Sequence, residues 1–210
     1  MDGLLLDSEI LWHKAEVEIF GTLGVPLAFD TGRSTKGMFV NEVVDYWYAQ
    51  YPWTGPSPHD VAEELLERVG NLVETEGRLL PGARWALDLA GERGPVAIAS
   101  STPLALIVRC LTHFELLERF ASIHSAELEP YGKPHPGVFL SAANSLGVAP
   151  SECLVVEDSA AGVLAAKAGR MCVIAVPTFE DRLEAAFALA DLVLTSLEDL
   201  TPEWFDERFA

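Results

Sequence analysis

The spacing of apolar residues along this chain changes near residue 80. Before that point, apolar residues recur every three or four positions, which is typical of amphipathic helices. The helices expected there are 8–24, 40–48 and one that begins at Ser57-Pro58. A capping residue followed by proline suits the first turn of a helix. Residues 8–80 are therefore predicted to form a helical segment.

After residue 80, the pattern predicts short strands that alternate with helices. The strand-like runs are rich in β-branched residues and do not alternate between apolar and polar positions, which is typical of parallel sheets covered on both faces. The expected strands are Val96–Ala99, Ser122–His124, Cys153–Val156, Cys172–Val176 and Leu192–Leu194. The expected helices are Pro103–His113, Pro136–Leu146, Ala160–Ala168 and Asp181–Ala190. We predict a doubly wound (Rossmann-like) α/β core of residues 1–7 and 81–210 that carries residues 8–80 as a helical cap.

The net charge of the chain indicates which classes of partner the protein does not bind. Fourteen Lys and Arg against 32 Asp and Glu give a net charge of −18 at pH 7. A surface this negative repels nucleic acid and anionic membrane surfaces, so neither is an expected partner. The three cysteines lie in apolar runs without metal-ligand spacing, and the sequence shows neither a membrane span nor a signal peptide. We expect a cytoplasmic protein that is a monomer or a weak dimer.

Four short stretches carry the residues best suited to chemistry. Each alone has a structural explanation, as a helix cap, a strand-to-helix turn, a solvated lysine or an acidic pair at a helix N-terminus. A parallel sheet, however, brings the carboxyl ends of its strands to one edge, where ligands of open α/β sheets bind. Carboxylates at that edge suit Mg²⁺, and hydroxyl, amide and ammonium donors suit a phosphate. The stretches are Met1–Glu9, Ser100-Ser101-Thr102, Lys133-Pro134-His135-Pro136 and Glu157-Asp158-Ser159.

Together, these stretches resemble the motifs of the haloacid dehalogenase superfamily. The resemblance is to the β-phosphoglucomutase-like branch, whose members are phosphatases and mutases with a helical cap. In addition, the segment Asn41–Trp53 is similar to bacterial phosphatases of 2-deoxyglucose 6-phosphate and hexitol phosphates. The four motifs occur in the family order, as Asp2-Gly3…Asp7-Ser8-Glu9, Ser100-Ser101, Lys133-Pro134-His135-Pro136 and Glu157-Asp158-Ser159.

The resemblance implies a Mg²⁺-dependent phosphatase of small sugar or hexitol phosphates that acts through an aspartyl-phosphate. It implies that Asp2 is the acid and base, and that its backbone carbonyl also binds the metal. It further implies that Lys133 neutralises charge on the nucleophile and on the phosphoryl group. Asp7 is expected to support the turn into the cap, and Glu9 stands at the entrance of the cap.

The remaining site residues bind the phosphate or the metal according to the same resemblance. Ser100 and the backbone amide of Ser101 would hold phosphoryl oxygens. Asp158 would bind Mg²⁺ directly, and Glu157 would bind it directly or through water. Many relatives have an arginine in the cap loop where this chain has Phe39, and Lys36 is the candidate to replace its charge.

The first motif departs from the family pattern, in which a hydrophobic strand leads into Asp-x-Asp-Gly. Asp2 matches the second Asp, so the nucleophilic Asp falls one residue before Met1, together with the strand that leads into it. In the usual strand order of this fold, that strand lies between the strands at Val96 and Cys153. We therefore expect a sheet without its first central strand, and a chain that begins at an internal Met of a longer enzyme and is inactive in this form.

Two other functions remain open at this point, and a third is disfavoured. A phosphosugar mutase of the same branch would need a cap that retains a bisphosphorylated intermediate. A non-catalytic sugar-phosphate-binding protein would follow if the chain truly starts at Met1. A haloacid dehalogenase is disfavoured, because that chemistry needs no metal and leaves Glu157 and Asp158 without a purpose.

Overall fold

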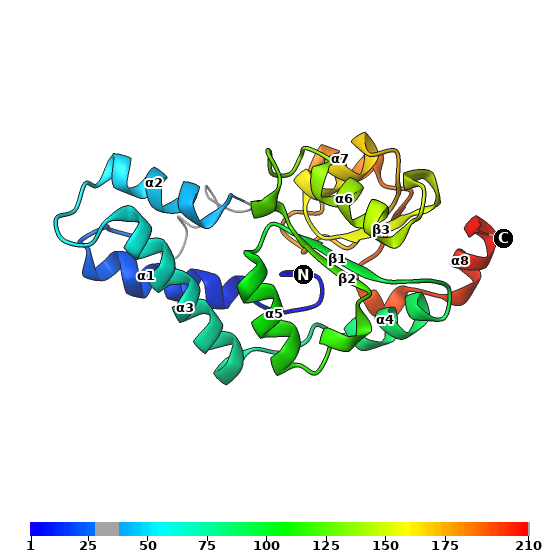
Figure 1. Cartoon of the computed structure of the whole chain (residues 1–210), viewed down its shortest axis with the longest axis horizontal. Coiled ribbons are helices and arrows are strands. Elements are labelled where there is room, and N and C mark those ends of the chain that lie inside the picture. Colours follow the sequence, from blue (N-terminus) through cyan, green and yellow to red (C-terminus); the bar gives the residue numbers. More distant parts are fainter. Residues whose placement is uncertain (28–37, 210) are drawn as a thin grey trace. The chain divides into compact units, whose positions relative to one another are not determined.

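The computed structural model describes residues 1–27 and 38–209 (Figure 1). The chain divides into two compact units. One unit consists of Met1–Leu6 together with Leu79–Ala210, and the other of Asp7–Arg78. The first unit contains every strand among the described residues, and the second is helical.

The helical unit contains α1 (Glu9–Thr22), α2 (Val40–Gln50) and α3 (Pro58–Glu76), close to the predicted helices. The third begins as the sequence indicates: the Asp60 amide donates to Ser57 Oγ at 3.2 Å, and the Ser57 amide donates to Asp60 Oδ2 at 3.1 Å. Ser8 precedes α1, but its side chain makes no capping hydrogen bond. Helix α3 packs against both α1 and α2.

The α/β unit contains parallel strands, as predicted. They fall into two sheets, with β1 beside β2 in one and the order β3-β4-β5 in the other. Ser100 at the end of β1 is paired with Ser125 at the end of β2, and Glu157 at the end of β3 is paired with Ala175. The strands are β1 (Ala97–Ser100), β2 (Ser122–Ser125), β3 (Leu154–Glu157), β4 (Cys172–Ala175) and β5 (Leu192–Val193).

Helices connect these strands in the manner of a βα core. In Figure 1, α5 and α6 lie on opposite sides of the β1–β2 pair, and α7 packs on β3 and β4. The helices are α4 (Ala83–Gly91), α5 (Leu104–His113), α6 (Gly137–Leu146), α7 (Ala160–Ala168) and α8 (Pro202–Phe209). Short 3₁₀ turns complete the unit at η2 (Leu117–Arg119), η3 (Ala126–Leu128), η4 (Pro150–Glu152), η5 (Ala185–Leu189) and η6 (Leu197–Asp199).

The predicted helix Asp181–Ala190 is wrong, since the segment contains only the 3₁₀ turn η5. The first residues of the segment form a turn that is closed by Thr178. The Thr178 hydroxyl donates to Asp181 Oδ2 at 2.8 Å and accepts from the Asp181 amide at 3.3 Å. Within η5 only Phe187 is buried, so the segment has no apolar stripe that would stabilise a longer helix. Helices α4 and α8 were not predicted.

The strands differ in how completely they are buried. All four residues of β4 are buried, as expected of a strand with a neighbour on each side. In β1 and β3, by contrast, half-buried and buried residues alternate. No helix among residues 1–27 and 38–209 is long and apolar enough to cross a membrane.

Candidate active site

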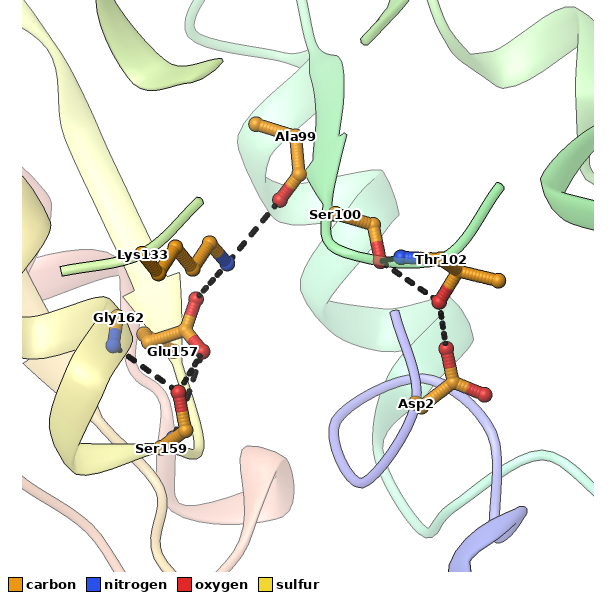
Figure 2. A network of polar contacts seen from close by, with 8 residues as sticks. All are labelled: Asp2, Ala99, Ser100, Thr102, Lys133, Glu157, Ser159 and Gly162. Carbon is orange, nitrogen blue, oxygen red and sulfur yellow. Dashed lines mark hydrogen bonds and ion pairs between the residues drawn. The ribbon is translucent and has the colours of Figure 1, made fainter. Parts of the chain in front are cut away.

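The predicted site residues of the α/β unit lie at the carboxyl ends of β1 and β3 and on two segments beside them. Ser100 ends β1, and Glu157 ends β3. Asp2 comes from the turn that opens the chain, and Lys133 comes from the loop between η3 and α6. Figure 2 shows that they form two polar clusters, one around Thr102 and one around Glu157.

The first cluster joins Asp2 to the hydroxyl groups that follow β1. Thr102 Oγ1 donates to Asp2 Oδ2 at 2.6 Å, and Ser100 Oγ donates to Thr102 Oγ1 at 3.0 Å. The backbone amide of Thr102 donates to Ser100 Oγ at 3.2 Å. Ser100 and Thr102 are buried, whereas Ser101 between them is half-buried. The turn therefore brings Asp2 and Ser100 together, as the sequence predicts, through a threonine to which the sequence analysis gave no role.

The turn after β1 is tied to the end of the neighbouring strand. Ser125 Oγ donates to the carbonyl of Thr102 at 2.7 Å and accepts from the Glu127 amide at 3.2 Å. Glu127 Oε1 in turn accepts from the Leu104 amide at 2.7 Å, at the start of α5. Ser125 is buried, and its hydrogen bond fixes the turn after β1 from the protein interior. Sequence reasoning missed it, and the available signal was a serine directly after the predicted strand Ser122–His124.

The second cluster centres on an ion pair shielded from water. Lys133 Nζ lies 2.9 Å from Glu157 Oε2, and the side chain of each residue is only 8% exposed. Ser159 Oγ donates to Glu157 Oε1 at 2.8 Å, and it also accepts from the Gly162 amide at 3.0 Å, which caps α7. Both oxygens of the Glu157 carboxylate are therefore hydrogen-bonded.

Lys133 also reaches the first strand. Its Nζ donates to the carbonyl of Ala99 on β1 at 3.4 Å (Figure 2). The same Nζ lies 4.7 Å from the centre of the Phe139 ring. A buried ammonium group at this place can neutralise an anion that binds at the carboxyl ends of β1 and β3, which we call the rim. Lys133 thus links the end of β1 to the end of β3.

The electrostatics of Glu157 favour its charged form. Burial is the largest single influence on the pKa of Glu157 and raises it, whereas the positive charges of Lys133 and of the Met1 amino group lower it. With the hydrogen bonds from Lys133 and Ser159, they hold the pKa of Glu157 below its usual value. The charged form of Glu157 is therefore favoured in the folded protein, and Lys133 contributes to this both by its charge and by its hydrogen bond.

The third group of interest is the pair of adjacent acids at the end of β3, Glu157 and Asp158. Asp158 is buried, as is Glu157. In the described part of the chain, no three His, Cys, Asp or Glu side chains come close enough to hold a metal ion among them. The predicted metal ligands are the backbone carbonyl of Asp2, the Asp158 carboxylate and Glu157, directly or through water, and this set does not require three clustered side chains. In the structure, Lys133 and Ser159 engage the Glu157 carboxylate, and Thr102 donates to the Asp2 carboxylate.

The candidates from the helical segment are only partly described. Phe39 directly precedes α2, and its backbone amide donates to Glu42 Oε2 at 2.9 Å. Lys36 lies outside the described residues. Asp7 is exposed, and its amide donates to the carbonyl of Arg78 at 3.0 Å. These two residues are the first and the last of the helical unit.

Comparison with known proteins shows the family of the chain. The model of the haloacid dehalogenase-like hydrolase family matches residues 1–170. Hexitol phosphatase B of Escherichia coli K12 is 45% identical over 203 residues, which cover 96% of this chain and 91% of that protein.

Solved structures have the same fold. The crystal structure of CbbY from Rhodobacter sphaeroides in complex with phosphate has a TM-score of 0.83 at 28% identity, and the match covers 95% of this chain and 93% of that one. The crystal structure of β-phosphoglucomutase from Clostridium difficile also has a TM-score of 0.83, and the match covers 99% of this chain and 93% of that one. At 24% identity, the second similarity is one of fold alone.

Proposed function

Because this chain belongs to the haloacid dehalogenase-like hydrolase family, we propose that its site hydrolyses phosphate monoesters of hexitols and related small sugars. The class of phosphoric monoester hydrolase rests on the 45% identity to hexitol phosphatase B over nearly the whole chain. The observation that carries the site assignment is the buried Lys133, which contacts both Glu157 and the end of β1. It supplies a water-shielded positive charge where a phosphate would bind.

Asp2 carries the proton in this proposal. The hydrogen bond from Thr102 Oγ1, 2.6 Å long, orients its carboxyl group. As an acid, Asp2 gives a proton to the sugar oxygen when the P–O bond breaks. As a base, it takes a proton from the water that hydrolyses the aspartyl-phosphate. The aspartate that is phosphorylated is the one that the family pattern places directly before Met1.

In this proposal, Ser100 and Ser101 at the end of β1 bind the phosphate. Ser100 Oγ and the half-buried Ser101 stand at the end of the strand, and the loop is fixed by Ser125. Lys133 completes the set of donors. Donors that are already fixed before the reaction lose little free energy to reorganisation when negative charge develops on the phosphoryl oxygens.

Magnesium fits the donors at this rim. Mg²⁺ takes one or two protein carboxylates and keeps waters and substrate oxygens, so a site without three clustered acids is suitable for it. The buried Asp158 and the backbone carbonyl of Asp2 are the direct ligands that we propose. Glu157 is assigned to bind through water, because Lys133 and Ser159 engage its carboxylate. When bound, the ion supplies positive charge to a phosphoryl oxygen.

The experiment is a screen of phosphate esters with the chain extended by a short apolar segment that ends in Asp before Met1. Phosphate release should be fastest with hexitol phosphates or hexose phosphates. The chain that begins at Met1 is the matched control and should show no turnover. Comparable activity in both forms would contradict the assigned nucleophile. Isomerisation of a sugar phosphate without phosphate release would identify a mutase, and binding without turnover in the extended chain a binding protein.

A further inference from the structure

The loop that carries Lys133 joins the 3₁₀ turn η3 to helix α6. Glu129 follows η3 directly, Gly137 begins α6, and residues 130–136 lie between them, which we call the lysine loop. Lys133 lies in the middle of the lysine loop, so its position depends on how the two ends of the loop are held. Prolines, whose φ angle is fixed, restrict the backbone of this loop at Pro130, Pro134 and Pro136.

The carboxylate of Glu129 lies along the beginning of α6. Ser141 Oγ donates to Glu129 Oε1 at 2.6 Å, a length typical of a hydrogen bond from a hydroxyl group to a charged carboxylate. The other oxygen is beside Gly137, because a Cβ atom at residue 137 would lie 2.8 Å from Glu129 Oε2. Gly137 and Ser141 are one helical turn apart, so the Glu129 carboxylate spans the first turn of the helix.

This place suits a negative charge. Pro136 precedes α6 and makes no side-chain capping hydrogen bond. Glu129 supplies a carboxylate to the same helix end from the other side of the lysine loop, where the helix dipole favours it. Glu129 therefore ties the beginning of the lysine loop to the helix that follows its end.

Helix α6 also contacts the rest of the lysine loop. The Gly137 amide donates to His135 Nδ1 at 3.1 Å, and the Phe139 ring lies 4.7 Å from Lys133 Nζ. The helix in turn packs against both β1 and β2. It is thus a support that is fixed to the sheet and that holds the lysine loop at both ends and at Lys133.

Lys133 requires such a support because its contacts are demanding. Its side chain is only 8% exposed, and its Nζ spans from Glu157 Oε2 at 2.9 Å to the carbonyl of Ala99 at 3.4 Å (Figure 2). A lysine side chain is long and flexible, so the backbone beneath it has to be fixed if Nζ is to keep one position. A misplacement of about 1 Å in a group that acts on the substrate can cost about 100-fold in rate.

We propose that Glu129 is a positioning residue: it closes the lysine loop onto α6 and thereby holds Lys133 Nζ between Glu157 and the end of β1. Glu129 acts through Lys133. The sequence analysis gave no role to Glu129 or to its partner Ser141. The effect on phosphate rests on the proposed function, in which Lys133 neutralises the phosphoryl group, whereas the closure of the lysine loop rests on the contacts alone.

The test measures how fast acetic anhydride acetylates the side chain of Lys133 in the full chain, by mass spectrometry of its peptides. A shielded lysine reacts when the surrounding structure opens, so the rate reports local opening. Glu129→Ala removes the acceptor of the closing hydrogen bond and Ser141→Ala removes its donor, whereas Glu129→Gln keeps an acceptor of the same length. Ile174→Val in the buried strand β4 is the matched control, because it lowers stability modestly and lies away from the lysine loop.

Glu129→Ala and Ser141→Ala should each raise the acetylation rate of Lys133 by about 10-fold or more, because a hydrogen bond to a carboxylate is lost. Glu129→Gln should stay within about threefold of the wild type, and Ile174→Val should leave the rate unchanged. Lys167, whose side chain is 33% exposed, is the reference within each sample. An unchanged Lys133 rate in Glu129→Ala, or an equal rise in Ile174→Val, would overturn the proposal.

Binding of inorganic phosphate in the presence of Mg²⁺, measured by calorimetry, tests the consequence for the site. Glu129→Ala should weaken phosphate binding by about 10-fold, and Glu129→Gln and Ile174→Val should bind as the wild type does. Wild-type affinity in Glu129→Ala would overturn the positioning role. If Lys133 reacts faster in Glu129→Ala but the wild type binds no phosphate, the closure of the lysine loop stands and the proposed function fails.

Discussion

At the scale of single residues, Lys133 is the group on which the site most depends. It compensates the charge of Glu157 in a place from which water is largely excluded. Removal of one partner of such a pair leaves the other buried and uncompensated, which costs more than the pair itself contributes.

The substitution Lys133→Met should therefore lower the free energy of unfolding by about 3–5 kcal/mol. The double substitution Lys133→Met with Glu157→Gln should recover much of this loss, because it removes the stranded charge and keeps a group that can accept from Ser159. Urea unfolding of the wild type and both variants is the measurement. A double variant no more stable than Lys133→Met would contradict the ion-pair account.

Glu16 is a second residue whose charge matters, and it lies in the helical unit. It belongs to the buried face of α1, and burial raises the pKa of Glu16 to about 7. Between pH 4.5 and pH 7, Glu16 is therefore protonated in the folded state and deprotonated in the unfolded state. Stability from this group is complete below pH 4.5 and is lost as the pH rises toward 7 and beyond.

The substitution Glu16→Gln should remove this dependence. At pH 8 the variant should be more stable than the wild type by about 2–3 kcal/mol, and near pH 4 the difference should vanish. Urea unfolding at a series of pH values tests this. Glu18→Gln on the exposed side of α1 is the control, and it should not reproduce the gain at pH 8. A Glu16→Gln variant with the pH profile of the wild type would contradict the assignment.

At the scale of elements, the beginning of α7 is shaped around the site. Ser159 caps this helix and bonds Glu157 with the same hydroxyl group. Gly162 in its first turn leaves room for Glu157, because a Cβ atom at residue 162 would collide with the Glu157 side chain. The glycine is therefore required by close approach.

The substitution Gly162→Ala should destabilise the protein by roughly 1–3 kcal/mol, since the Glu157 side chain has to move away from Lys133. Gly91→Ala at the end of α4 is the matched control, because a Cβ atom there meets nothing within 4 Å. The control should be neutral or stabilising by up to about 1 kcal/mol. Thermal unfolding of both variants decides the matter, and equal effects at the two glycines would show that Gly162 has no special role.

The helices and strands also show how much of the structure could be predicted from the sequence. Periodicity located each strand to within one or two residues, because buried β-branched runs between helices have few alternatives. It missed α4, whose nine residues offer only a short periodic pattern after Gly82, and α8, which is mostly polar. It placed the Ser100–Thr102 stretch, Lys133 and Glu157 at one edge but gave Thr102 no role and missed Ser125. The contacts of Thr102 with Asp2 and of Ser125 with the Thr102 carbonyl join residues far apart in the sequence, and local pattern does not contain them.

At the scale of the whole molecule, the negative charge opposes the binding of an anionic substrate. The chain has a net charge of −18, while the site offers a local positive group in Lys133. Long-range repulsion is screened by salt, whereas the short contacts at the site are screened much less.

For the active, extended chain, kcat/KM for a dianionic phosphate ester should therefore rise by about two- to fivefold when the ionic strength increases from about 10 mM to about 150 mM at constant Mg²⁺. Steady-state rates at a series of sodium chloride concentrations measure this. The same monoester near pH 5 is the control, because below its second pKa of about 6 it carries about one negative charge instead of two, and its kcat/KM should rise less with salt. A fall in kcat/KM with salt would mean that local attraction outweighs the overall charge.

The central claim is that the rim formed by Asp2, Ser100, Lys133 and Asp158 hydrolyses phosphate monoesters with the help of magnesium. The most direct measurement is phosphate release from a hexitol phosphate by the extended chain, in Mg²⁺, in EDTA and after Mg²⁺ is restored, with Asp158→Asn alongside. We predict release in Mg²⁺, a loss of about 100-fold or more in EDTA or with Asp158→Asn, and recovery on restoring Mg²⁺ in the unsubstituted chain only. Undiminished release in EDTA, or full activity of Asp158→Asn, would contradict the account.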